Sequence, residues 1–226
     1  MPSKVDTGQS EVESEAGSLS GLSLDEVAQR IVSCQDCSLA RGRTRAVPGE
    51  GPAKAEILFV GEGPGYHEDQ QGRPFVGPAG KFLEELLASV GLGREEVFIA
   101  NIVKCRPPGN RDPLPPEIQA CSKYLDRQVE LIGPRMIVTL GRYSLARFFP
   151  GQSIGKVHGT WRESDGTKLF AMYHPAAALH QQSLKQTIEA DMLKIPQVLA
   201  QDGAQAGDQA GDREPEEPQP KQLSFF

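Results

Sequence analysis

Four cysteines are spaced so that their thiolates could bind one metal centre. Cys34 and Cys37 have two residues between them, and Cys105 and Cys121 lie at the two ends of a proline-rich segment. Four thiolates suit either zinc or an iron–sulfur cluster, and the number of ligands does not separate the two. Packing in the core is the alternative for Cys105 and Cys121. A redox role for the first pair would require a preceding strand, and none is predicted there.

Three other side chains are of the types that recognise a flat heterocycle. Phe75 lies between prolines and glycines, where its ring could stack on a base. Asn101 follows a predicted strand and offers a donor and an acceptor to one base edge. His174, fixed before a proline, can donate a hydrogen bond to an anion that develops on a leaving group. The ordinary alternatives are core packing for the Phe, turn formation for the Asn and turn capping for the His.

A glycine-rich segment, residues 61–65, follows the first predicted strand. Its first two glycines have the spacing of a dinucleotide-binding fingerprint, but Pro64 removes an amide and the next helix is expected only after Pro78. We instead expect the segment to bring backbone close to a flat ligand, because glycine has no side chain to block the approach. A tight strand exit is the alternative. The glycines concerned are Gly61, Gly63 and Gly65.

The elements that must position these residues follow from the apolar pattern. Buried parallel strands are predicted at residues 57–60, 97–100, 136–140 and 169–173. Helices are predicted at about residues 24–32, 81–87, 115–131, 142–149 and 183–199. Their alternation predicts an α/β fold, a three-layer α/β/α sandwich with a central four-stranded, mainly parallel sheet. Ligands in such folds bind at the carboxyl ends of the strands, so the three segments after strands should meet in one cleft.

The net charge of −6 belongs to the two ends of the chain. Residues 1–22 and 201–226 are acidic and poor in apolar residues, which predicts disordered tails around one folded domain at residues 23–200. That domain is close to neutral and could present a basic face to phosphates. The candidates, which cluster near the cysteines, are Arg41, Arg43, Arg45, Lys104, Arg106 and Arg111, with Lys104 and Arg106 as the predicted DNA contacts. Ordinary solvated charge is the alternative.

Several classes of protein are excluded by composition. No apolar run approaches the roughly 20 residues that cross a bilayer, and the N-terminus lacks the pattern of a signal peptide. We therefore expect a cytoplasmic protein with no membrane partner. We also expect a monomer. In a reducing compartment four cysteines favour metal ligands, catalytic thiols or core residues over disulfides.

Taken together, residues 24–200 resemble the iron–sulfur uracil-DNA glycosylases of family four. The resemblance rests on Cys34-Gln35-Asp36-Cys37, Gly61-Glu62-Gly63-Pro64-Gly65, Glu68-Asp69, Gly72-Arg73-Pro74-Phe75-Val76-Gly77, Asn101-Ile102-Val103-Lys104-Cys105-Arg106-Pro107-Pro108, Cys121 and Tyr173-His174-Pro175-Ala176. It implies a monofunctional enzyme that hydrolyses the N-glycosidic bond of uracil in DNA and so initiates base excision repair, in association with the nucleoid. It also implies a structural [4Fe–4S] cluster held by Cys34, Cys37, Cys105 and Cys121.

The resemblance assigns roles within the cleft. Phe75 would stack on the flipped uracil, Asn101 would read its polar edge, and His174 would stabilise negative charge on a carbonyl oxygen as the bond breaks. Relatives in the wider superfamily carry an acidic residue where this chain has Gly63, which leaves Glu62 or Glu68 as candidates to orient water. The bond could also break dissociatively without a general base, and Glu68 could instead exclude the methyl group of thymine.

Two further segments resemble interaction sites. Residues 176–180 are expected to form a loop that enters the DNA stack, with Leu179 as the wedge. The last five residues resemble the bacterial sliding-clamp binding motif, which implies that the tail binds the replication clamp; packing of the two Phe on the body is the alternative. The residues concerned are Gln222, Leu223, Phe225 and Phe226.

Three other functions remain open at the level of sequence. The protein could be a glycosylase of broader deaminated-base specificity, for which Gly63 leaves room. It could be an iron–sulfur electron-transfer protein with a flavodoxin-like body. It could also bind damaged DNA without cutting it.

Overall fold

The computed structural model describes residues 19–201. In this part of the chain five strands form one sheet in the order β2–β1–β3–β5–β4. The pairs β2–β1, β1–β3 and β3–β5 are parallel, and the pair β5–β4 is antiparallel. The strands are β1 (Ile57–Gly61), β2 (Phe98–Asn101), β3 (Met136–Leu140), β4 (Trp161–Ser164) and β5 (Thr167–Met172). The predicted α/β class is confirmed, but the sheet has five strands rather than four.

The additional strand, β4, lies at an edge of the sheet, and a search of the sequence for apolar runs does not find it. Arg162 and Glu163 in the middle of β4 are exposed, so the strand has no continuous buried run. It turns into β5 through Asp165 and Gly166, whose φ angles of 50° and 75° are those that a two-residue hairpin turn requires. The Asp-Gly pair was therefore the available sequence signal for this hairpin.

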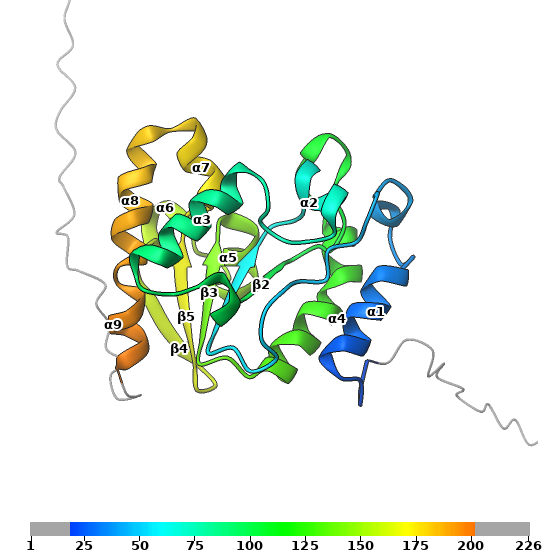
Figure 1. The fold of residues 1–226 in the computed structure, drawn as a ribbon, viewed down its shortest axis with the longest axis horizontal. Coiled ribbons are helices and arrows are strands. Elements are labelled where there is room, and N and C mark those ends of the chain that lie inside the picture. The colour runs from blue at the N-terminus through cyan, green and yellow to red at the C-terminus, as the bar shows by residue number, and fades with distance from the viewer. Residues whose placement is uncertain (1–18, 202–226) are drawn as a thin grey trace, which may run out of the picture.

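Helices cover both faces of the sheet (Figure 1). They are α1 (Leu24–Ser33), α2 (Tyr66–Gln71), α3 (Pro78–Ser89), α4 (Pro115–Ile132), α5 (Arg142–Phe148), α6 (Ile154–Val157), α7 (Pro175–His180), α8 (Gln182–Met192) and α9 (Ile195–Ala200). Short 3₁₀ helices occupy Ser38–Arg41, Arg94–Glu96 and Pro108–Asn110. None of the helices in residues 19–201 is long and apolar enough to cross a membrane.

Alternation along β1 divides the core into two parts. Leu58 and Val60 pack with residues of α1, α4 and α5, whereas Ile57 and Phe59 pack with residues of α3, α8 and α9. Successive side chains of a strand point to opposite faces, so a strand buried on both sides joins both clusters. Figure 1 shows the resulting layers, with α1 and α4 on one side of the sheet and α8 and α9 on the other.

Three helical segments differ from the prediction. Helix α2 begins directly after Gly65, where no helix was expected, because six residues are too few to show an apolar stripe. Residues 176–180, predicted as a loop, belong to helix α7. The single helix predicted at 183–199 is two helices, since α8 ends at Met192 and α9 begins at Ile195. Residues 1–18 and 202–226, which include most of both predicted tails and the clamp-like motif, lie outside the described residues.

Candidate functional site

One cavity of about 230 Å³ opens at the carboxyl ends of the parallel strands. The segments that follow β1, β2 and β5 all contribute to it, as the strand order requires. Its lining includes seven of the predicted site residues, namely Glu62, Gly63, Gly65, Glu68, Phe75, Asn101 and His174. Pro64, Pro107 and Arg111 also line it, as do Ala79 and Asn110, which the sequence did not single out.

Asn101 lines this cavity and carries an unsatisfied polar atom. The residue ends β2 and is 2% exposed, and its Oδ1 atom is buried without a hydrogen-bond partner. A buried acceptor without a donor costs about 1–3 kcal/mol, which a ligand N–H group would recover. Gly61 makes room for the amide, because a Cβ atom there would lie 2.4 Å from Asn101 Oδ1. Gly61 therefore acts from behind the cavity wall.

His174 is held as a neutral ring with one defined tautomer. It follows β5 as the N-cap of α7, and its Nδ1 atom accepts a hydrogen bond from the Ala176 amide at 3.1 Å. Burial lowers the pKa of His174 to about 4, although the nearby Glu68 charge acts to raise it. The neutral ring therefore carries its proton on Nε2, which makes that atom a hydrogen-bond donor.

Phe75 stands beside His174 in an unusual backbone conformation. The two ring centroids are 5.4 Å apart and the ring planes are inclined by 23°. The φ angle of Phe75 is 49°, in the left-handed region that side chains other than glycine seldom adopt. Gly61 also leaves room for this ring, because a Cβ atom there would lie 2.8 Å from two of its atoms.

The two candidate carboxylates differ in their surroundings. Glu68 accepts hydrogen bonds from the amides of Gly65, Val76 and Gly77 at 2.9–3.1 Å, so both of its oxygens are engaged with backbone. Burial raises the pKa of Glu62, the charge of Asp112 raises it further, and Arg142 opposes the shift. Of the two carboxylates, Glu62 is thus the better placed to accept a proton.

The four cysteines line a second cavity in common. Arg43 Nη1 donates to Cys105 Sγ at 3.0 Å, and the Lys104 amide donates to Cys121 Sγ at 3.3 Å. Burial raises the pKa of Cys121 to about 11, so binding a metal there would release the thiol proton. The sequence grouped Arg43 with the basic residues that could face phosphates and did not predict this contact, because nothing local relates it to a cysteine 62 residues away.

The spacing of these thiols bears on the kind of metal centre. Within residues 19–201, no three Cys, His, Asp or Glu side chains are grouped as ligands of a single metal ion. Each thiolate of a four-iron cluster binds a different iron atom, so its ligands are set further apart than those of one zinc ion. Four cysteines around a shared cavity are the donor set that such a cluster uses.

Lys104 does not belong to a DNA-binding surface, contrary to the prediction. It is 1% exposed, and its Nζ atom donates to the Asn101 carbonyl at 2.9 Å and to Gln128 Oε1 at 2.6 Å. Burial lowers the pKa of Lys104 to about 8. An amine enclosed by these acceptors cannot reach a phosphate, so its role is internal.

Exposed side chains near the cavity could face DNA. Arg106 donates from Nε to Asn110 Oδ1 at 2.7 Å, and its guanidinium lies 5.2 Å from the ring centroid of Tyr66. Tyr66 is 54% exposed at the start of α2, and Leu179 is 52% exposed on α7. Tyr66 was not singled out in the sequence, although an aromatic residue directly after a glycine segment was a possible signal.

Comparisons with known proteins agree with this geometry. A family model described as the uracil DNA glycosylase superfamily matches residues 48–194. A type-4 uracil-DNA glycosylase of Sulfurisphaera tokodaii is 50% identical over 183 residues, which cover 76% of this chain and 83% of that protein. Type-4 enzymes of Archaeoglobus fulgidus and Thermotoga maritima are 48% and 43% identical over 182 and 187 residues. These matches cover 76% and 80% of this chain, and 92% and 96% of the two relatives.

Proposed function

The chain belongs to the uracil-DNA glycosylase superfamily, and from this membership we propose that it excises uracil from DNA by hydrolysing the N-glycosidic bond. The product is DNA with an abasic site, so the reaction initiates base excision repair. The observation that carries the proposal is the unpaired Oδ1 atom of Asn101, buried in a cavity that a neutral His174 and the ring of Phe75 also line. A duplex buries its glycosidic bonds, so the nucleotide must be flipped into this cavity.

Asn101 supplies the selection for uracil over cytosine. Its Oδ1 atom accepts the N3–H group of uracil while its amide donates to the O4 carbonyl. Cytosine has an unprotonated nitrogen and an amine at the same two positions. Asn101 Oδ1 would then face the nitrogen, which is also an acceptor, and the Asn101 NH2 group would face the amine, which is also a donor. A site built on buried hydrogen bonds rejects such a mismatch strongly, because the polar groups stay unpaired.

Bond cleavage uses the remaining groups of the cavity. As the bond from the sugar carbon to the base nitrogen breaks, its electron pair moves onto uracil, and the sugar becomes cationic. His174 Nε2–H donates to the uracil O2 oxygen on which negative charge develops. Water adds to the sugar carbon and loses a proton, for which Glu62 is the acceptor with the raised pKa. Phe75 stacks on the base and holds it in line.

Cys34, Cys37, Cys105 and Cys121 hold a [4Fe–4S] cluster in this proposal. Bound there, the cluster would cross-link the segment that follows α1, which holds Cys34 and Cys37, to the segment after β2 and to α4, which hold Cys105 and Cys121. The hydrogen bond from Arg43 to Cys105 stabilises the thiolate form of that ligand. The cluster is thus structural, and it fixes the segment that begins with Asn101.

The surface around the cavity binds the DNA backbone and stack. Arg106 contacts a phosphate, Tyr66 stacks against a base that flanks the uracil, and Leu179 on α7 enters the gap in the stack.

The protein works as a monomer, as expected for an enzyme that scans the nucleoid, and its C-terminal residues 222–226 tether it to the sliding clamp. Deletion of these five residues should abolish clamp binding and leave uracil release unchanged; clamp binding that survives the deletion contradicts the tether.

Release of free base from a labelled oligonucleotide tests the main proposal. The protein with its cluster intact should release uracil and leave the matched thymine and cytosine oligonucleotides untouched. The same assay with hypoxanthine and xanthine separates a uracil enzyme from one of broader specificity. If no base is released while uracil-containing DNA is still bound, the chain is a DNA-binding protein and the proposal is wrong.

A further inference from the structure

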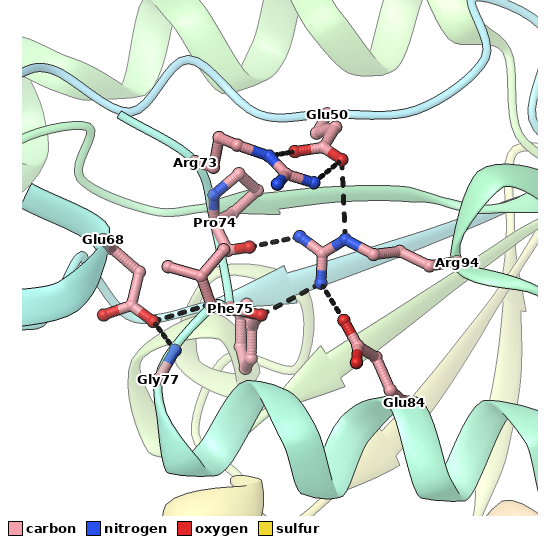
Figure 2. Close-up of polar contacts among 9 residues, drawn as sticks. Glu50, Glu68, Arg73, Pro74, Phe75, Gly77, Glu84 and Arg94 are labelled. Carbon is pink, nitrogen blue, oxygen red and sulfur yellow. Dashed lines mark hydrogen bonds and ion pairs between the residues drawn. The ribbon is translucent and has the colours of Figure 1, made fainter. Parts of the chain in front are cut away.

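Two side chains of opposite charge bind the peptide group that joins Phe75 to Val76, one at its carbonyl and the other at its N–H group. Arg94 Nη1 donates to the Phe75 carbonyl at 2.9 Å, and Glu68 Oε1 accepts the Val76 N–H group at 2.9 Å. A trans peptide directs its C=O and N–H groups in opposite directions. Figure 2 accordingly shows Arg94 and Glu68 on opposite sides of the segment.

The contacts continue onto the neighbouring peptide groups. Arg94 Nη2 donates to the Pro74 carbonyl, and Glu68 Oε1 also accepts the Gly77 N–H group at 2.9 Å. Arg94 is thereby a fork that binds two consecutive carbonyls, and Glu68 is a bridge between two consecutive amides. Hydrogen bonds to charged groups are stronger than hydrogen bonds between neutral groups.

The conformation held in this way is one that the chain would not adopt by itself. The φ angle of 49° at Phe75 is unfavourable relative to an ordinary backbone, because the Cβ atom is crowded in the left-handed region. Gly80 permits it, because a Cβ atom at that position would lie 1.9 Å from the Phe75 carbonyl oxygen. Without the charged contacts, the strained peptide could relax and carry the ring away from the position it holds beside His174.

Arg94 is itself held in place from the side away from the cavity. Its side chain is 14% exposed, and it pairs with Glu50 through Nε at 3.5 Å and with Glu84 through Nη1 at 3.4 Å. Glu50 also forms a two-point ion pair with Arg73, at 2.7 and 2.8 Å, so it anchors both arginines (Figure 2). Arg94 does not line the cavity, and it acts on the base only through Phe75.

We infer that Arg94 is a positioning residue for uracil: with Glu68 it fixes the peptide after Phe75, so that the stacking ring is already in place before the base enters. This inference rests on the proposed function. Preorganisation of this kind reduces the ordering that the base must impose on the pocket, so its loss should lower kcat/KM for uracil removal.

A double-mutant cycle tests the inference. Arg94→Met keeps an unbranched apolar side chain but removes the guanidinium with all its donors, and it should lower kcat/KM for a uracil oligonucleotide by about ten-fold or more. In a Phe75→Ala background the same substitution should change kcat/KM by less than about two-fold, because no ring remains to be positioned. Equal effects in both backgrounds would show that Arg94 has only a general structural role and would overturn the inference.

Arg135 provides the matched control. It also pairs with a carboxylate, Glu56, and donates to a backbone carbonyl, that of Leu199, but it lies at the amino end of β3 and does not line the cavity. Arg135→Met should leave kcat/KM unchanged. If it lowers kcat/KM as much as Arg94→Met does, the effect is one of general stability and the inference fails.

Two further measurements keep the result interpretable. Arg94→Lys retains the charge but replaces the planar pair of guanidinium nitrogens with a single ammonium, so it should recover only part of the wild-type kcat/KM. It serves in the cycle if Arg94→Met does not fold. Full recovery of kcat/KM with Lys would contradict the role of the two-carbonyl contact. Wild-type protein that releases no uracil would contradict the proposed function itself, whereas wild-type release with additive mutations would contradict this inference alone.

Discussion

The Nδ1 atom of His174 accepts the backbone amide of Ala176 at 3.1 Å, and this single contact decides what the other ring nitrogen can do. With Nδ1 occupied as an acceptor and the pKa of His174 lowered to about 4, the Nε2 atom keeps its proton throughout the neutral pH range. A neutral ring that already carries this proton can donate it in a hydrogen bond to a developing anion without a change in its own protonation state. The N-cap contact of the six-residue helix α7 therefore fixes which ring nitrogen of His174 is the donor and which is the acceptor.

The stability of the protein should depend on pH through His174. Its pKa is lower in the folded protein than the usual value of 6.5, so the unfolded chain binds more protons between pH 6.5 and about 4. The free energy of unfolding should therefore fall as the pH is lowered through this window. Urea unfolding at several pH values should show a shallower dependence for His174→Gln than for the wild type; identical slopes would contradict a lowered pKa.

Removal of the Asn101 side chain should abolish most uracil release. Asn101→Ala loses both hydrogen bonds to the base edge, and we expect kcat/KM to fall by about 10² or more. The cavity loses an unsatisfied acceptor at the same time, so the free energy of unfolding should stay constant or rise. Thermal melting beside the release assay checks both. Full activity of this variant would show that Asn101 is only a turn residue.

Sequence predicted the parallel strands and the cleft because these depend on local patterns. Strands buried on both faces are apolar runs, and the carboxyl ends of parallel strands meet at one edge. The environment of Lys104 was not predictable, because a lysine in a basic stretch has the same appearance whether it meets water or Gln128 of α4. The contact of Arg94 with Phe75 joins residues 19 apart that no periodic pattern relates.

Helix α2 gives the same lesson on a smaller scale. Its six residues are too few for an amphipathic pattern, and Tyr66 at its start is exposed. The available signal was Glu68, three residues after Gly65, whose carboxylate accepts the Gly65 amide as in a capping box. The same carboxylate binds the segment that carries Phe75, so a helix cap also became part of the site.

Arg106 and Lys104 should differ in their effect on DNA binding although both are cationic. Arg106→Ala should weaken binding to all sequences and reduce the slope of log Kobs against log salt by about one, as expected for one lost phosphate contact. Lys104→Met should leave that slope unchanged, because the amine is buried against the Asn101 carbonyl. A titration of labelled oligonucleotide at several salt concentrations measures both slopes. A lower slope for Lys104→Met would contradict the buried placement.

The metal content of the purified protein tests the cysteine cavity. Four thiolates around a shared cavity should bind about four iron atoms per chain, together with inorganic sulfide. Cys121→Ser should lower the iron content and the melting temperature together, because the cluster joins α4 to the segment that begins with Asn101. Asn101 lies at one end of that segment, so loss of iron should also lower kcat/KM for uracil. One zinc atom per chain with no sulfide would contradict the cluster, and full activity of iron-free protein would contradict its role in holding Asn101.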